Sequence, residues 1–273
     1  MKGLDHIVMC VNDLDQAADA YRQLGFTVTP RAKHPFGTHN CIIQLDGFFL
    51  ELLTVGEPEK VPAEKTGHFG FARFNQHYLK QRQGISMLVM DTSDFRDDNK
   101  AARKAGLSTY PPFEFSRKAI LPSKEVVEVS FGLNFVTHPK IPDAGFFTCQ
   151  QFQPEYFWKP EYQRHDNTAR QIIEVCMVAN KPAKFASFMS AFTHCDITDA
   201  SDSQVTIDTS RGRVVIASPP VFQQRYQTSA PDLPNGPQLA GLTIGVKAAP
   251  PPPINICGTA ILFDTLAKEN AKK

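Results

Sequence analysis

The sequence predicts an α+β fold built from repeated units of one strand, one helix and three strands (βαβββ). Residues 4–11 alternate as a strand does. Residues 13–25 then carry apolar residues at helical spacing, with Asp13 placed to cap the helix. Residues 38–55 form two apolar runs joined by Asp46-Gly47, and Asp-Gly between such runs is a strong hairpin signal. These observations define a first unit that ends near residue 56.

His6 is the exception on an otherwise apolar face of the first strand, and Glu51 is the one charge in the last strand of this unit. Two ionisable groups on mostly buried strands need each other or a metal ion to offset their desolvation. Strict alternation predicts that the first strand has one face formed by Leu4, His6, Val8 and Cys10 and another formed by Asp5, Ile7, Met9 and Val11.

The order of elements repeats along the chain. A second copy is predicted with a strand at 84–92, a helix at 94–106 and strands near 108–117, 126–138 and 145–152. A third has a strand at 170–180, a helix at 182–193 and a hairpin at 205–218, and an abbreviated fourth has strands at 239–246 and 258–263 with Pro250 to Pro253 between them. In this register Met87 and Glu174 take the place of His6, and Cys149 and Ile216 take the place of Glu51.

At 273 residues the chain is long enough for two domains. We expect a first domain at 1–153, with modules 1–56 and 84–152 joined by 57–83, in which 69–83 form an extra helix. Residues 154–168 are expected to be a linker, and the second domain at 169–273 holds modules 169–219 and 239–263. Whether modules pair within one chain or across a homodimer stays open.

Charge and hydropathy exclude several classes of function. Lys+Arg number 29 and Asp+Glu 28, so no basic surplus indicates nucleic acid or an anionic membrane as a partner. No apolar run approaches the ~20 residues of a membrane span, and the first residues enter a strand directly, so we expect a cytoplasmic protein with a small-molecule ligand. The six cysteines lack CxxC spacing and are expected to be reduced.

The segments DHIVMCVNDLDQAADAYRQLGF, GTHN and FFLELL resemble the glyoxalase-like branch of the vicinal oxygen chelate superfamily, which includes glyoxalase I and the extradiol dioxygenases. The resemblance is good over residues 1–56, fair to about 220 and poor beyond. It implies sheets curved into half-barrels and a divalent metal between paired modules, with His6 and Glu51 at two of the ligand positions. Imidazole and carboxylate together suit Zn, Fe, Mn or Ni.

The remaining candidate residues surround this pair. Glu51 and His39 are candidate catalytic groups, and Asn40 is a candidate to bind a substrate oxygen, although GTHN also reads as a turn at Gly37 followed by a strand. The other substrate-binding candidates are Phe49, Met87, Phe147 and Gln150, the last through a bulge. A carboxylate could be recognised by Arg31, Lys33, Arg73 or Arg117, which the sequence does not rank. The second domain is expected to be structural.

Two functions follow from these residues. One is a metal-dependent lyase, isomerase or dioxygenase in which an ion at His6 and Glu51 holds two neighbouring substrate oxygens. The other is a metal-free protein that binds or sequesters a small molecule, as in the bleomycin-resistance branch of the same superfamily. Lost donors at Met87 and Cys149 favour binding, and the surviving pair favours an enzyme.

Overall fold

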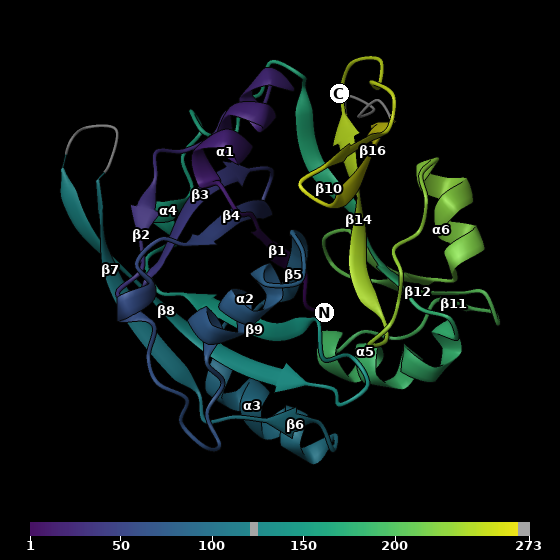
Figure 1. The fold of residues 1–273 in the computed structure, drawn as a ribbon, viewed down its shortest axis with the longest axis horizontal. Helices are drawn as coiled ribbons and strands as arrows, with labels where there is room; N and C mark the ends of the chain where they lie inside the picture. Colours follow the sequence, from purple (N-terminus) through teal and green to yellow (C-terminus); the bar gives the residue numbers. More distant parts are fainter. Residues whose placement is uncertain (121–124, 267–273) are drawn as a thin grey trace, which may run out of the picture.

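The computed structural model describes residues 1–120 and 125–266 and has two open β-sheets with helices around them. In Figure 1 the strands of the first sheet lie on the left, and the green and yellow strands of the second lie on the right. The α+β class and the βαβββ modules are confirmed, including the abbreviated fourth module, which has strands but no helix among its described residues.

The first sheet has nine strands among the described residues, in the order β2-β3-β4-β1-β5-β9-β8-β6, with β7 paired to β8. Their bounds are β1 Leu4–Cys10, β2 Ala32–Lys33, β3 Thr38–Gln44, β4 Phe49–Val55, β5 Gly84–Asp91, β6 Ser108–Thr109, β7 Phe113–Ile120, β8 Val126–Thr137 and β9 Gly145–Gln151.

The second sheet has seven described strands in the order β11-β12-β13-β10-β14-β16-β15. Their bounds are β10 Ala169–Val178, β11 Asp199–Ala200, β12 Gln204–Asp208, β13 Arg213–Ala217, β14 Gln238–Val246, β15 Ile254–Ile256 and β16 Thr259–Thr265.

The helices begin where the sequence provides caps or prolines. Asp13 accepts hydrogen bonds from the backbone N–H groups of Asp15 and Gln16 at the start of α1, both at 3.0 Å. The helices are α1 Leu14–Gln23, α2 Phe71–Leu79, α3 Phe95–Lys104, α4 Pro154–Phe157, α5 Ala186–Thr193 and α6 Pro219–Tyr226, with short 3-10 helices η1 Pro58–Lys60 and η2 Pro182–Phe185. The sequence did not predict α6.

All four modules share one backbone irregularity. β1 and β5 pair antiparallel, as do β10 and β14, and in both pairings single extra residues interrupt the register. Four of the extra residues, Asp5, Ser86, Ile173 and Ala240, are β-bulges at the equivalent position of their modules. A further extra residue, Arg170, lies near the start of β10. The repeated bulges support the alignment that places Met87 and Glu174 where His6 stands.

Three clusters of buried side chains divide the molecule. The outer faces of both sheets and helices α1, α3 and α5 contribute to one continuous core, so the two sheets are packed against each other. We call the face of each sheet that points away from this shared core its inner face. The inner face of the first sheet packs against α2, and the inner face of the second packs against α6. Because the sheets share a core, the division into two domains stays a prediction.

In the described part of the chain, no helix has the length and apolar character needed to cross a membrane.

Candidate active site

A small cavity opens on the inner face of the first sheet. It has room for about 50 Å³ and is lined by seven phenylalanines and a few polar groups. The lining residues are His6, His34, Phe36, Asn40, Ile42, Phe49, Glu51, Phe71, Phe115, Arg117, Phe131, Leu133, Phe147, Cys149 and Phe157. A mostly apolar wall with few polar groups is the usual composition of a small-molecule site.

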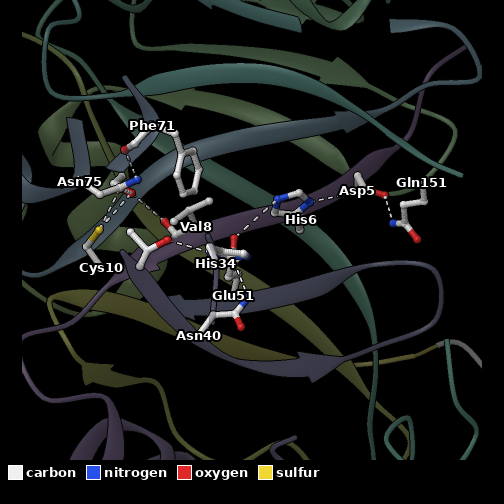
Figure 2. A network of polar contacts seen from close by, with 12 residues as sticks. Asp5, His6, Val8, Cys10, His34, Asn40, Glu51, Phe71, Asn75 and Gln151 are labelled. Carbon is white, nitrogen blue, oxygen red and sulfur yellow. Dashed lines mark hydrogen bonds and ion pairs between the residues drawn. The ribbon is translucent and has the colours of Figure 1, made fainter. Parts of the chain in front are cut away.

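His6 is held by the residue that precedes it. Its Nδ1 donates to Oδ2 of Asp5 at 2.6 Å, and both side chains are buried. Neighbouring residues of a regular strand point to opposite faces, but the bulge at Asp5 brings both polar side chains into contact. Gln151 donates to the other oxygen of Asp5 at 3.2 Å (Figure 2). In the neutral ring, Nε2 is then the unprotonated nitrogen, and it faces Glu51.

The bulge also corrects the predicted faces of β1. Leu4 packs in the outer core with Ile7 and Met9, whereas Val8 belongs to the inner cluster. The prediction that Leu4 shares a face with His6 was therefore wrong. The physical reason is the one extra residue, which shifts the alternation by one position.

Glu51 lies at the centre of the polar groups. Oε1 accepts a hydrogen bond from the Asn40 side chain at 2.6 Å, and Oε2 lies 4.0 Å from Nε2 of His6. Nε2 of His34 lies 3.8 Å from Oε1 (Figure 2). Burial raises the pKa of Glu51, although His6 and Asn40 act in the opposite direction. Such a carboxyl group can both hold and release a proton closer to neutral pH.

His34 comes from the loop before β3. Gly37 (φ 91°) makes the turn, and the ring of His34 folds back so that Nδ1 is hydrogen-bonded to the Thr38 hydroxyl at 2.8 Å. Desolvation, reinforced by the positive charge of Arg117, lowers the pKa of His34 to about 3. His34 is therefore neutral in the physiological range and adds no charge to the cavity.

Arg117 on β7 supplies the cation of the cavity. It forms no ion pair with another residue of the described chain, and burial lowers the pKa of its guanidinium while the charge of Glu51 raises it. An arginine keeps its charge under these conditions. Of the four basic residues considered in the sequence, Arg31 pairs with Asp15, Lys33 with Glu57, and Arg73 donates to the carbonyl of Pro62. Only Arg117 of these four lines the cavity.

The candidates divide into those at the cavity and those away from it. Phe49 stacks on His6 with ring centroids 4.2 Å apart, and Phe147 meets the same ring edge-on at 5.4 Å. Met87 packs in the inner cluster with them but does not line the cavity, contrary to the sequence prediction. His39 instead donates to Glu57 at 2.9 Å, and the Gln150 side chain accepts from the N–H of Phe95. Neither His39 nor Gln150 lines the cavity.

Strand pairing also revises which residue stands in the place of Glu51. Val8 pairs with Glu51 in β4, and the equivalent Val89 pairs with Phe147 in β9, so Phe147 rather than Cys149 occupies that place. In the second sheet the same comparison gives Val215, because Cys176 is the equivalent of Val8. Ile216 points to the outer core. The conclusion that both copies lack the donor is unchanged.

Several residues of the site were not identified as site residues from the sequence, among them the lining residues Phe36, Ile42, Phe71, Phe115, Phe131 and Leu133. Asp5 and His34 are two more, because Asp5 is bonded to His6 and His34 lies beside Glu51. Phe157 also lines the cavity, although it belongs to the segment expected to be a linker. The aromatic run at Tyr156-Phe157-Trp158, unusual for a solvated linker, was the available signal.

A divalent metal, implied by the superfamily, can be tested against these donors. Two donors on one ion with bonds of ~2.0–2.2 Å lie only about 3.0–3.5 Å apart. His6 and His34 lie 4.0 and 3.8 Å from different oxygens of Glu51. Across residues 1–120 and 125–266, no three His, Cys, Asp or Glu side chains are placed to hold an ion. The present arrangement does not fit a metal, and a metal at His6 and Glu51 stays a prediction.

The inner face of the second sheet is filled. Glu174, at the place of His6, is buried and accepts from Arg213 at 2.9 Å, from Arg225 at 2.5 Å and from the Tyr226 hydroxyl at 3.2 Å. Arg225 and Tyr226 belong to α6, which covers this face. The sequence did not predict α6, and Arg225 was missed with it. The charge of Glu174 is therefore balanced within the protein.

The fold is that of the vicinal oxygen chelate superfamily. A model of the glyoxalase-like domain family matches residues 4–193, and the chain belongs to that family. No curated protein matches the sequence.

Two solved structures show the same fold. A hypothetical protein from Staphylococcus aureus is 16% identical with a TM-score of 0.74, covering 97% of this chain and 100% of that one. A mutant of 4-hydroxymandelate synthase from Streptomyces coelicolor is 12% identical with a TM-score of 0.52, covering 90% and 71%. At these identities the similarity concerns the fold alone.

Proposed function

We propose that the chain is a glyoxalase-like enzyme of the isomerase or lyase type, which moves a proton on a small molecule with two neighbouring oxygens. The observation that carries the proposal is the buried line from Asp5 through His6 to Glu51 in an apolar cavity. A carboxylate that orients a histidine toward a reacting group is a recurrent arrangement in proton transfer.

Each residue has a role in this proposal. Glu51, whose pKa is raised by burial, removes a proton from the carbon next to the substrate carbonyl. Nε2 of His6 accepts the proton of the neighbouring hydroxyl, since Nδ1 is bonded to Asp5. Arg117 stabilises the negative charge that develops on the carbonyl oxygen. Glu51 then returns its proton to the adjacent carbon and His6 gives the hydroxyl proton to the former carbonyl oxygen, which completes an isomerisation, and no step is assigned to a metal.

The test is exchange of substrate carbon-bound hydrogen with solvent deuterium, followed by NMR over a panel of small 2-hydroxycarbonyl compounds. We expect exchange by the tag-free protein, persistence after chelation and a loss of at least ~100-fold in Glu51→Gln. Activity that disappears on chelation and returns with one added ion would overturn the assignment of no step to a metal.

The second candidate is a metal-free binding protein. It is favoured by the phenylalanine wall and by the apolar residues Met87 and Phe147 at the positions of a second donor pair. A compound that binds in the cavity without exchange or turnover in any condition would support this candidate and overturn the enzyme.

A further inference from the structure

A second, larger hollow adjoins the cavity, and we name it the outer groove. It has a volume of about 730 Å³. Its walls are the segment from Thr29 to Lys33, parts of β3, β7 and β8, and the segment from Tyr156 to Tyr162. Asn40, Ile42, Arg117 and Phe157 line both spaces, so the groove lies beside the cavity that contains His6 and Glu51.

The outer groove is strongly basic. Its lining contains Arg31, Lys33, Arg117, Lys118 and Lys159 and no aspartate or glutamate. The whole chain is nearly neutral, with 29 basic and 28 acidic residues, so this surplus is local. A hollow lined by charges of one sign concentrates ligands of the opposite sign.

Neighbouring acids neutralise only part of this charge. Arg31 pairs with Asp15 at 2.6 Å and Lys33 lies 3.6 Å from Glu57. Lys118 has Glu128 opposite it on β8 but forms no ion pair with a described residue. The ammonium group of Lys159 donates to the backbone carbonyl of Glu155, which leaves its charge unbalanced. Arg117, Lys118 and Lys159 remain available to an anion.

The sizes of the two spaces decide how a ligand must lie. The cavity, at about 50 Å³, holds only a few atoms, since one water needs ~10–15 Å³ on the same measure. A ligand that reaches His6 and Glu51 with more than a small head must extend into the outer groove. The part that extends then lies among cations.

We infer that the ligand carries an anionic group, a carboxylate or a phosphate, which binds in the outer groove to Lys118 and Lys159 while its neutral head enters the cavity. This inference rests on the proposed function for the role of the head, to which Arg117 is assigned. Lysine binds phosphate as a point charge. Tyr156 and Tyr162 line the same groove.

The test compares wild type with the double variant Lys118→Gln/Lys159→Gln and with a charge-matched control, Lys80→Gln/Lys181→Gln, whose lysines are exposed outside the groove. Probes are inorganic phosphate, dihydroxyacetone phosphate, glycerate and neutral dihydroxyacetone, measured by calorimetry and NMR shifts. We expect the anionic probes to bind at least tenfold more weakly to the groove variant and unchanged to the control, with affinity falling as salt rises.

The two proposals fail separately in this experiment. Equal binding of the anionic probes to both double variants, or no preference for anionic probes over dihydroxyacetone, overturns the groove. Preference for glycerate or for dihydroxyacetone phosphate identifies which anion it takes. Anion binding that depends on Lys118 and Lys159, together with exchange that does not depend on Glu51, keeps the groove and overturns the proton-transfer function.

Discussion

Asp5 and His6 are neighbours in the chain, yet their side chains are bonded to each other and buried. The carboxylate of Asp5 fixes the orientation of the His6 ring and determines which ring nitrogen carries the proton. The aspartate of a Ser-His-Asp catalytic triad has the same role. Because Gln151 holds the other oxygen of Asp5, the position of His6 is set from β9 as well as from β1.

Asp5→Asn is expected to lower kcat/KM by at least ~100-fold with little change in fold, because an amide can donate to Nδ1 and so favour the wrong tautomer. Steady-state kinetics measures kcat/KM, and circular dichroism checks that the variant keeps its fold. The control is Asp19→Asn, an exposed residue of α1 that pairs with Arg22. An unchanged rate in Asp5→Asn would remove His6 from the mechanism.

Glu51→Gln is expected to lose activity and gain stability at neutral pH. The pKa of Glu51 is raised above its ordinary value of 4.5, so the folded state keeps a proton that the unfolded chain has lost. The free energy of unfolding contributed by Glu51 therefore declines as pH rises through that window. Neutral glutamine removes the decline and adds on the order of 1 kcal/mol at pH 7.

Urea unfolding of wild type and Glu51→Gln at pH 4 and pH 7 measures this difference. The two proteins should differ more at pH 7 than at pH 4. A larger difference at pH 4, or a less stable variant at pH 7, would mean that Glu51 is stabilised as a carboxylate by its neighbours.

At the scale of elements, α2 and α6 cover the inner faces of the two sheets differently. Helix α2 leaves a cavity on the inner face of the first sheet, whereas Phe222 and Tyr226 of α6 fill the corresponding face of the second. Gly241 permits this contact, since a Cβ there would lie 2.6 Å from the Tyr226 ring. The presence of α6 supports a structural role for the second sheet.

Glu174→Ala is expected to lower the free energy of unfolding by about 2–4 kcal/mol, because it leaves two arginines near the buried face without their partner. Binding of ligand to the folded protein should not change, whereas Glu51→Ala should abolish it. If Glu174→Ala does not fold, Glu174→Gln keeps the shape and serves instead. Loss of binding in a folded Glu174 variant with binding intact in Glu51→Ala would place the site in the second sheet.

The sequence predicted most elements because their signals are local, such as the Asp13 cap and the Asp46-Gly47 hairpin. It could not place the bulge at Asp5, since alternation does not show which residue is extra. His34 reaches the cavity through a turn rather than through strand spacing. Helix α6 was missed because its eight residues begin with two prolines and carry no clear apolar period.

At the scale of the molecule, the two sheets share one continuous core of outer-face side chains. Residues of β1 and β5, such as Ile7 and Leu88, are buried in the same cluster as Val175 and Met177 of β10. If the two sheets separated, each would expose apolar side chains to water.

Thermal unfolding is therefore expected to be a single cooperative transition. The one tryptophan, Trp158, lies beside Phe49 and Phe157 at the cavity, so its fluorescence reports on the first sheet, while far-UV circular dichroism reports on both. The two melting curves should coincide, and Leu88→Ala should shift both by the same amount, at a cost of about 2–5 kcal/mol. Two separated midpoints would show that the sheets unfold independently.

The bulges at Asp5, Ser86, Ile173 and Ala240 mean that the backbone repeats more faithfully than the chemistry does. Met87 occupies the position equivalent to that of His6, and Phe147 the position equivalent to that of Glu51, on strands that pair in the same way. For protein engineering, the first sheet thus already contains a second, symmetry-related pair of positions, one of which, Phe147, lines the cavity and is a place to introduce a donor side chain by substitution alone.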